Sequence, residues 1–198
     1  MSSVTKWSRD APIAVSAFEP FGGREHNRSL GLLRRLTRLR RINAHVLPVA
    51  FAPLPRAVAA IAARKPRRWL MLGESALATG LKLEQRAWNR IDARLPDNLG
   101  AQPRGGKVAR GPLVRSTGLP IDEWVSALAA MGVAAEHSLN AGRFACNAAY
   151  YLALSALDAD RVLFVHVPTD EAHGSDALLA GGLALLINHL RNFEGEAD

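Results

Sequence analysis

The chain has 198 residues, a length typical of one domain, and 48% of them are hydrophobic, too many for a disordered chain. The formal net charge is +7 at pH 7. The one cysteine, Cys146, excludes an intrachain disulfide framework, a zinc ribbon and a CxxC redox motif. Three roles are left for this thiol: a buried apolar residue, a stray thiol or a nucleophile.

The chain has no apolar run near the ~18–20 residues that a membrane-spanning helix needs. Its first residues lack the apolar core and the cleavage site of a signal peptide. We therefore expect a soluble, cytoplasmic protein without a membrane partner, in which a lone thiol stays reduced. The expected domain spans 1–198, with flexible ends at 1–10 and 193–198.

Short apolar runs alternate with helical patterns along the chain, which predicts an α/β domain with helices on both faces of its sheet. A long excursion with short strands is predicted where Gly and Pro gather, between 97 and 118. The predicted strands are 13–16, 44–47, 69–72, 134–138 and 162–167. The predicted helices are an arginine-rich one capped by Ser29, and 55–64, 121–131, 145–157 and 175–191.

The arginine-rich helix carries much of the positive charge of the chain. Leu32, Leu33, Leu36 and Leu39 recur there at three- and four-residue steps and predict an apolar stripe, opposite the arginines of 34–41. The basic face could contact the phosphates of a nucleic acid. A solvated face whose charge suits a helix C-terminus is the more common role of such a pattern. We expect no nucleic-acid partner.

Cys146 follows Gly142 at the start of a strong helical pattern. The unpaired N–H groups and the dipole of a first helical turn stabilise a thiolate, although a small residue packed under the helix would give the same pattern. A nucleophilic thiolate also needs a base. His166 ends a buried apolar run, and ligands bind beyond the carboxyl ends of strands in open α/β sheets. His166 is therefore a candidate base, with a hydrogen-bonded core histidine as the alternative.

The acid that would orient such a histidine is not decided by pattern. Glu74 follows a strand and a glycine, Glu84 lies further along, and either fits an ordinary surface glutamate. The six histidines show no close ligand spacing, so no metal site is expected. The glycines at 22–23 are not followed by the GK[ST] of a phosphate-binding loop.

Four blocks of sequence follow one another along the chain. The first is SAFEPFGG at 16–23, with Asn27 after it; the second comprises Glu84, Asn89, DARLPDN at 92–98, Gly100 and QP at 102–103. The third is NAGRFACN at 140–147, and the fourth is FVHVP at 164–168. Together they resemble the pyroglutamyl peptidases of cysteine peptidase family C15. That family removes an N-terminal pyroglutamyl residue from peptides. The resemblance implies a single-domain three-layer α/β/α sandwich around a mixed, mostly parallel sheet, of the phosphorylase/hydrolase-like kind.

The resemblance also implies a site, a substrate and partners. The implied substrate is a small peptide with a blocked N-terminus, and the implied reaction needs no cofactor or metal. The protein is expected to be a homo-oligomer (dimer or tetramer). Two phenylalanines would form apolar walls around the flat lactam ring. The implied residues are the triad Glu84, Cys146 and His166, oxyanion support from Arg94, and substrate binding by Phe18, Phe21, Asn27 and Glu74.

The chain departs from the family pattern next to the expected pocket. The family's GQAGGR-like segment reads GESALA at 73–78, so Glu74 replaces a glutamine, Leu77 a glycine and Ala78 an arginine. Arg143 replaces a small residue three positions before Cys146. An ionised glutamate accepts a hydrogen bond from the lactam N–H but donates none to the lactam carbonyl.

Three functions follow from these features. The first is hydrolysis of pyroglutamyl peptides through a thioester. The second keeps the triad but cleaves another small N-terminal acyl or amide group, such as one whose positive charge pairs with Glu74. The third is a non-catalytic protein that binds a partner through the basic helix at 34–41, and the intact triad argues against it.

Overall fold

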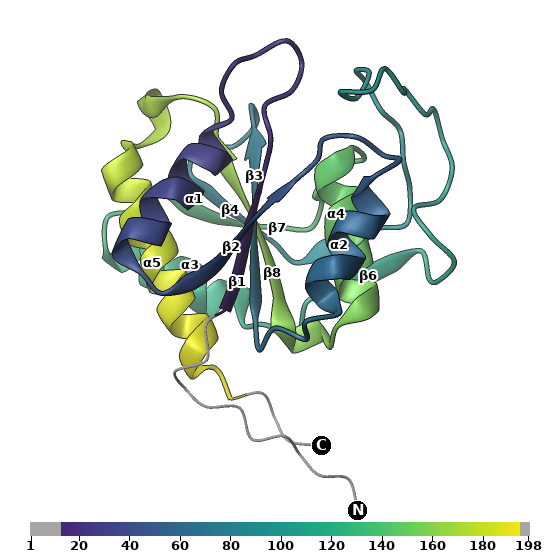
Figure 1. Ribbon diagram of the computed structural model, residues 1–198. Helices are drawn as coiled ribbons and strands as arrows, with labels where there is room; N and C mark the ends of the chain where they lie inside the picture. The colour runs from purple at the N-terminus through teal and green to yellow at the C-terminus, as the bar shows by residue number, and fades with distance from the viewer. Residues whose placement is uncertain (1–12, 195–198) are drawn as a thin grey trace, which may run out of the picture.

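The computed structural model describes residues 13–194, and these form a sheet between two layers of helices (Figure 1). The strands of this sheet are β1 (Ile13–Phe18), β2 (Ile42–Leu47), β3 (Trp69–Ser75), β4 (Leu81–Glu84), β7 (Ala135–Ser138) and β8 (Val162–Pro168). Their order is β2-β1-β3-β8-β4-β7. Neighbouring strands run parallel except β4 and β8. Of the predicted flexible ends, 1–10 and 195–198 lie outside the described residues.

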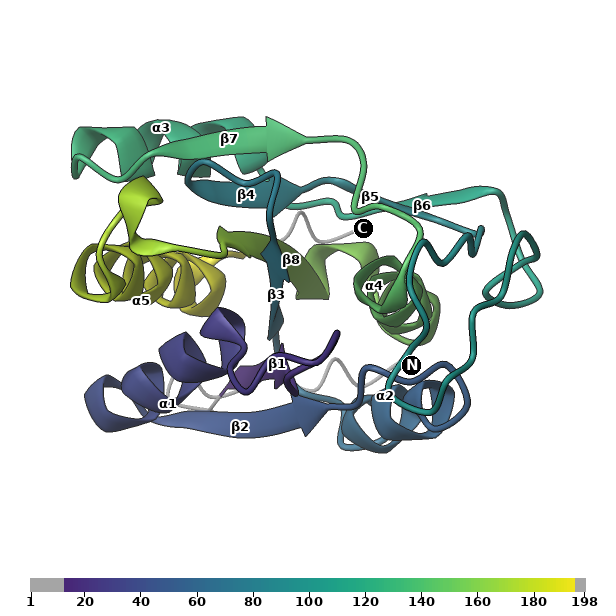
Figure 2. The ribbon, with the colours of Figure 1, turned by 90° about the horizontal axis from the view of Figure 1, so that it is seen from above.

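Helices cover both faces of the sheet, as the view from above shows (Figure 2). One face carries α1 (Arg28–Leu39), α3 (Ile121–Ala130) and α5 (Asp176–Asn192), and we call it the α1/α5 face. The other carries α2 (Leu54–Ala62) and α4 (Ala145–Ala156), and we call it the α4 face. The predicted three-layer α/β/α sandwich around a mixed, mostly parallel sheet is confirmed.

The central strands alternate their side chains between two apolar cores, because successive residues of a strand point to opposite faces. In β3, Leu70 and Leu72 enter the core of the α1/α5 face, whereas Trp69 and Met71 enter that of the α4 face. Since β3 and β8 are buried on both faces, their sequences are almost continuously apolar. The same alternation decides which polar side chains reach which face.

The arginine-rich helix α1 corrects two predictions. Its N-cap is Asn27, whose side chain accepts a hydrogen bond from the Ser29 N–H, so the predicted cap at Ser29 is wrong. Leu32, Leu33 and Leu36 are buried, but Leu39 is 51% exposed. Leu39 is the last helical residue, and there the stripe has already turned away from the core. The arginines at 34, 35 and 38 are exposed, as on a solvated face.

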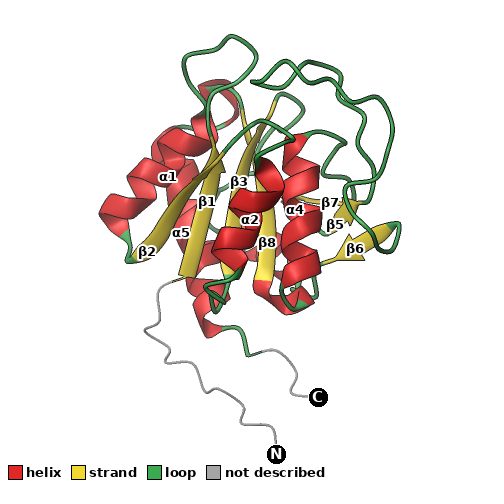
Figure 3. Ribbon diagram, turned by 45° about the vertical axis from the view of Figure 1, so that its right-hand side comes forward, coloured by secondary structure: helices red, strands yellow, loops and turns green. Residues whose placement is uncertain are grey.

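Two strands, β4 and β5, were not predicted, and β4 carries the candidate residue Glu84. Strand β4 spans Leu81–Glu84, and its two buried leucines alternate too briefly to stand out from a loop. Strand β5 (Arg86–Trp88) lies before the predicted excursion and pairs antiparallel with β6 (Val114–Ser116), which lies near the end of that excursion. Figure 3 shows this excursion and other long loops gathered at the carboxyl ends of the parallel strands. Within 13–194, no helix is long and apolar enough to cross a membrane.

Candidate active site

Three elements bring the predicted triad together on the α4 face. Glu84 ends β4, His166 lies in β8 and Cys146 is in the first turn of α4. Strands β4 and β8 are antiparallel neighbours, with Glu84 opposite Phe164, so Glu84 and His166 are diagonal neighbours on one face. Helix α4 packs over this face, which places Cys146 beside His166.

The carboxylate of Glu84 is completely buried and accepts a hydrogen bond from His166, with 2.8 Å between Oε1 and Nδ1. The interpretation of Glu84 as an ordinary surface glutamate is therefore wrong. Because Nδ1 is taken by Glu84, Nε2 is the imidazole nitrogen left for Cys146. The hydroxyl of Tyr150 donates to the Glu84 carbonyl at 2.8 Å and fixes the end of β4 against α4.

The environment of His166 changes its proton affinity. Burial by itself lowers the pKa of His166, because it disfavours the charged form. Hydrogen bonds to Cys146 and Glu84, together with the negative charge of both partners, outweigh burial and raise the pKa to about 9. These surroundings therefore stabilise the imidazolium form of His166.

This raised pKa predicts how stability depends on pH. The folded pKa of about 9 lies above the ordinary value of 6.5, so the proton on His166 stabilises the folded state. That contribution is fully present below pH 6.5 and is lost as the pH rises through 9. We expect the free energy of unfolding in urea to decline across this window. In His166→Asn the decline should be smaller, and an equal decline would contradict the assignment.

Gly73 of β3 makes room for the thiol. It is paired with His166 in the sheet and faces α4. A Cβ atom at this position would lie 2.9 Å from the Sγ of Cys146 and 2.8 Å from the Cζ of Phe164, closer than such contacts allow. The absence of a side chain at Gly73 is therefore what lets the thiol of Cys146 lie against the sheet.

Gly73→Ala is expected to lower kcat/KM by more than about tenfold, because the thiol must move away from His166. Gly31→Ala is the matched control, since a Cβ there meets nothing within 4 Å. It lies in α1, where alanine favours the helix. Thermal melts and kinetics of both variants check the prediction. A fully active Gly73→Ala would show that the close packing of the thiol does not matter.

The first turn of α4, which contains Cys146, has no side-chain N-cap. Its N-cap residue, Phe144, is extended and makes no side-chain capping bond. The N–H groups of the first helical turn have no partner within their own helix and can bind an anion. Asn147 anchors this turn: its side chain accepts from the Trp88 N–H at 2.7 Å and donates to the Trp88 carbonyl at 2.8 Å.

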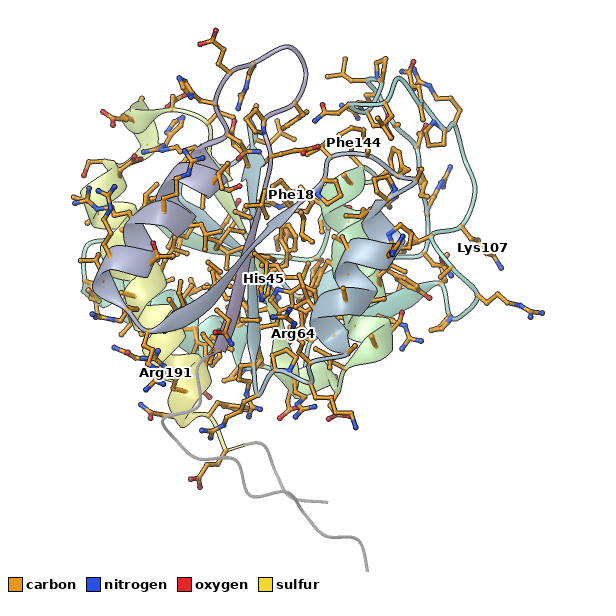
Figure 4. All side chains as sticks on the ribbon, in the orientation of Figure 1. Phe18, His45, Arg64, Lys107, Phe144 and Arg191 are labelled. Atoms are coloured by element: carbon orange, nitrogen blue, oxygen red, sulfur yellow. The ribbon has the colours of Figure 1, made fainter. Side chains whose placement is uncertain are left out.

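Aromatic rings belong to the apolar core of the α4 face, against which Cys146 also packs. Phe18 is buried, and its ring centroid lies 6.3 Å from that of Phe164. The ring centroid of Phe164 lies 4.9 Å from that of His166. Phe21 lies 6.0 Å from Phe144. Figure 4 labels Phe18 and Phe144 near the carboxyl end of the sheet. Sequence reasoning assigned no role to Phe144, although it stands two residues before Cys146 in the third block.

Two arginines expected near the thiol have different surroundings. Arg94 is exposed, and within the described part of the chain its side chain makes no hydrogen bond or ion pair, while its carbonyl accepts from Gln102 at 2.8 Å. Arg143 is held in place: its guanidinium lies 4.9 Å from the centre of the Trp88 ring and donates to Asn140 at 2.8 Å. The structure therefore fixes the position of Arg143 and leaves that of Arg94 open.

Glu74 and Asn27 are not brought to the triad by the structure. Glu74 follows Gly73 in β3 and so points to the α1/α5 face, where it pairs with Arg24 and accepts from the Arg28 N–H at 2.5 Å. The side chain of Asn27 is used in capping α1 and in donating to a carbonyl in the preceding loop. Both residues border a cavity of about 710 Å³ on this face.

The model of a family described as pyroglutamyl peptidase matches residues 11–173 of this chain. A pyrrolidone-carboxylate peptidase of Pseudomonas fluorescens (strain SBW25) is 37% identical over 165 residues, which cover 79% of this chain and 78% of that protein. One from Escherichia fergusonii is 34% identical over 165 residues, which cover 79% of this chain and 77% of that protein.

Solved structures agree with this similarity. A pyrrolidone carboxyl peptidase from Thermus thermophilus superimposes with a TM-score of 0.84 at 31% identity, covering 90% of this chain and 100% of that one. Pyroglutamyl peptidase I of Bacillus amyloliquefaciens gives a TM-score of 0.81 at 26% identity, covering 92% of this chain and 96% of that one.

Proposed function

Because this chain belongs to the pyroglutamyl peptidase family, we propose that its Glu84, Cys146 and His166 form the triad that removes N-terminal pyroglutamate from peptides. The protein is a cysteine omega-peptidase of this family. The observation that carries the triad is the buried contact of 2.8 Å between Glu84 Oε1 and His166 Nδ1, next to Gly73, against which the thiol of Cys146 packs.

The proposed reaction is acyl transfer through a thioester. His166 Nε2 takes the proton of Cys146, and Glu84 orients and stabilises the imidazolium. The thiolate attacks the pyroglutamyl carbonyl carbon, and the oxyanion collapses to expel the amine of the shortened peptide, which receives the proton from His166. Water, deprotonated by His166, then attacks the thioester and releases pyroglutamate and the thiol.

The oxyanion of each tetrahedral intermediate needs donors that are already in place. The open first turn of α4 supplies N–H groups next to Cys146. We assign the additional support to Arg94, whose exposed side chain makes no hydrogen bond or ion pair within the described part of the chain. No step requires a metal ion or a cofactor.

We place the lactam ring between Phe18 and Phe21, with Phe144 closing the apolar wall. A blocked N-terminus suits these apolar walls because the lactam carries no charge to be desolvated. A substrate cation that pairs with Glu74 is not favoured, since Glu74 is already neutralised by Arg24 on the other face. A homo-oligomer and a cytoplasmic location remain predictions from the sequence.

The test compares pyroglutamyl-, prolyl- and glutaminyl-aminomethylcoumarin as substrates of the purified protein. We expect turnover of the pyroglutamyl substrate alone, because the other two carry a free ammonium group. We also expect iodoacetamide to inactivate the enzyme by labelling Cys146.

Two outcomes would contradict the proposal. If no pyroglutamyl substrate is turned over while Cys146 still labels rapidly, the triad serves another small acyl group. If Cys146 labels no faster than a free cysteine, nucleophilic catalysis by this thiol is rejected.

A further inference from the structure

The guanidinium of Arg28 is buried behind the active site, on the α1/α5 face. Its side chain is 8% exposed, although it belongs to the first residue of a surface helix. Nε donates to Asp176 at 2.8 Å, and Nη2 donates to the Gly174 carbonyl at 2.5 Å. Nη1 donates to the carbonyl of Asp170 and, at 3.4 Å, to that of Pro168. One side chain thus ties α1 to the segment 168–176.

That segment begins two residues after His166. Beyond Pro168, the other hydrogen bonds of this described segment are short-range ones, such as Ala172 N–H to Asp170 and Gly174 N–H to the Glu171 carbonyl. Such local bonds shape the loop but do not attach it to the rest of the molecule. Arg28 provides that attachment, with four donated bonds to 168–176.

The main chain of Arg28 also reaches the neighbouring strand. Its N–H donates to the carboxylate of Glu74, the residue after Gly73. In the sheet, Gly73 is paired with His166 and Glu74 with Val167. Glu74 and Val167 face α1, whereas Gly73 and His166 face the thiol.

We propose that Arg28 is a positioning residue for His166: it clamps the back of β3 and β8 so that Gly73 and His166 keep their place under Cys146. This inference rests on the proposed function. An imidazole that serves as base must stay within about 3 Å of the atom whose proton it takes. Displacement of a reacting group by about 1 Å costs up to ~100-fold in rate. Arg28 touches neither substrate nor thiol and acts through the strands.

Arg28→Met tests the clamp, because it keeps an unbranched apolar stem like that of arginine and removes every side-chain donor. Arg35→Met is the matched control, since Arg35 lies on the same helix, is exposed and loses the same charge. We expect Arg28→Met to lower kcat about tenfold or more, with KM changed little. Arg28→Lys should recover part of kcat, and Arg35→Met should match the wild type.

The second readout is the pH profile of Cys146 alkylation by iodoacetamide, which reports the contact between thiol and imidazole without any substrate. In Arg28→Met the profile should shift toward that of an unpaired thiol. If Arg28→Met does not fold, Asp176→Asn, which weakens one contact of the clamp, is measured in the same way and should show a smaller change of the same sign.

The inference is overturned if Arg28→Met folds and keeps the wild-type alkylation profile. This holds even if its kcat and its melting temperature both fall. If Arg28→Met does not fold, the same outcome for Asp176→Asn overturns the inference. Failure of the proposed function looks different: the wild type itself would then not hydrolyse the pyroglutamyl substrate. The alkylation profiles would still decide whether Arg28 positions His166.

Discussion

Cys146→Ser is expected to lower hydrolysis of a pyroglutamyl substrate by at least ~1,000-fold, while the fold stays intact. A serine hydroxyl is a much weaker acid than a thiol, and neither the helix start nor His166 is arranged to ionise it. The side chains are almost the same size, so the packing against Gly73 should survive. Steady-state kinetics and thermal melts measure the two effects separately.

The composition of the chain supplies an internal control for this variant. Because Cys146 is the one cysteine, iodoacetamide labelling measured by mass spectrometry must disappear in Cys146→Ser. Suppose that a preparation of the variant that takes up no iodoacetamide label still turns over substrate at more than a few per cent of the wild-type rate. That result would exclude Cys146 as the nucleophile.

Glu84→Gln is expected to have the second largest effect, a loss of kcat of about 100- to 10,000-fold with KM little changed. The amide has the size of the carboxylate but no charge to stabilise the imidazolium. Burial, which lowers the pKa of His166, would then be opposed by fewer compensating interactions. We therefore expect the pKa of His166 to fall, which can be followed by NMR of the imidazole protons.

Glu136→Gln is the matched control for loss of a carboxylate. Glu136 lies on β7, the strand next to β4, and pairs at 3.0 Å with Lys82 while its side chain is 50% exposed. An exposed ion pair of this kind contributes little to stability. We therefore expect kcat to stay close to that of the wild type. If Glu84→Gln is equally active, Glu84 is a buried structural acid and the triad assignment is wrong.

The layered fold was readable from the sequence because its central strands are strongly apolar and its helices strongly periodic. The run at 162–167 and the helix after Gly142 appear in the structure with nearly the predicted ends. The short strand β4 was missed, since four residues with two leucines resemble a loop. Its place beside β8 depends on hydrogen bonds to a segment far along the chain, which local periodicity does not encode.

The site was predictable in part, and the reason differs for each residue. Cys146 and His166 were candidates from their places in a helix start and a strand end. Glu84 was chosen over Glu74 by family resemblance alone. In the structure, strand alternation separates these two glutamates: Glu84 faces His166, and Glu74 faces Arg24 and α1.

The single cysteine and the blocks around it determined, from sequence alone, which chemistry this chain could carry out and which family it belongs to. The tertiary structure decided which acid serves His166, which glycine makes room for the thiol, and that the substituted Glu74 acts behind the sheet. The physical reason is that sequence patterns report local conformation. The register between β3, β8 and β4, and hence the face each side chain occupies, is set by contacts between distant segments.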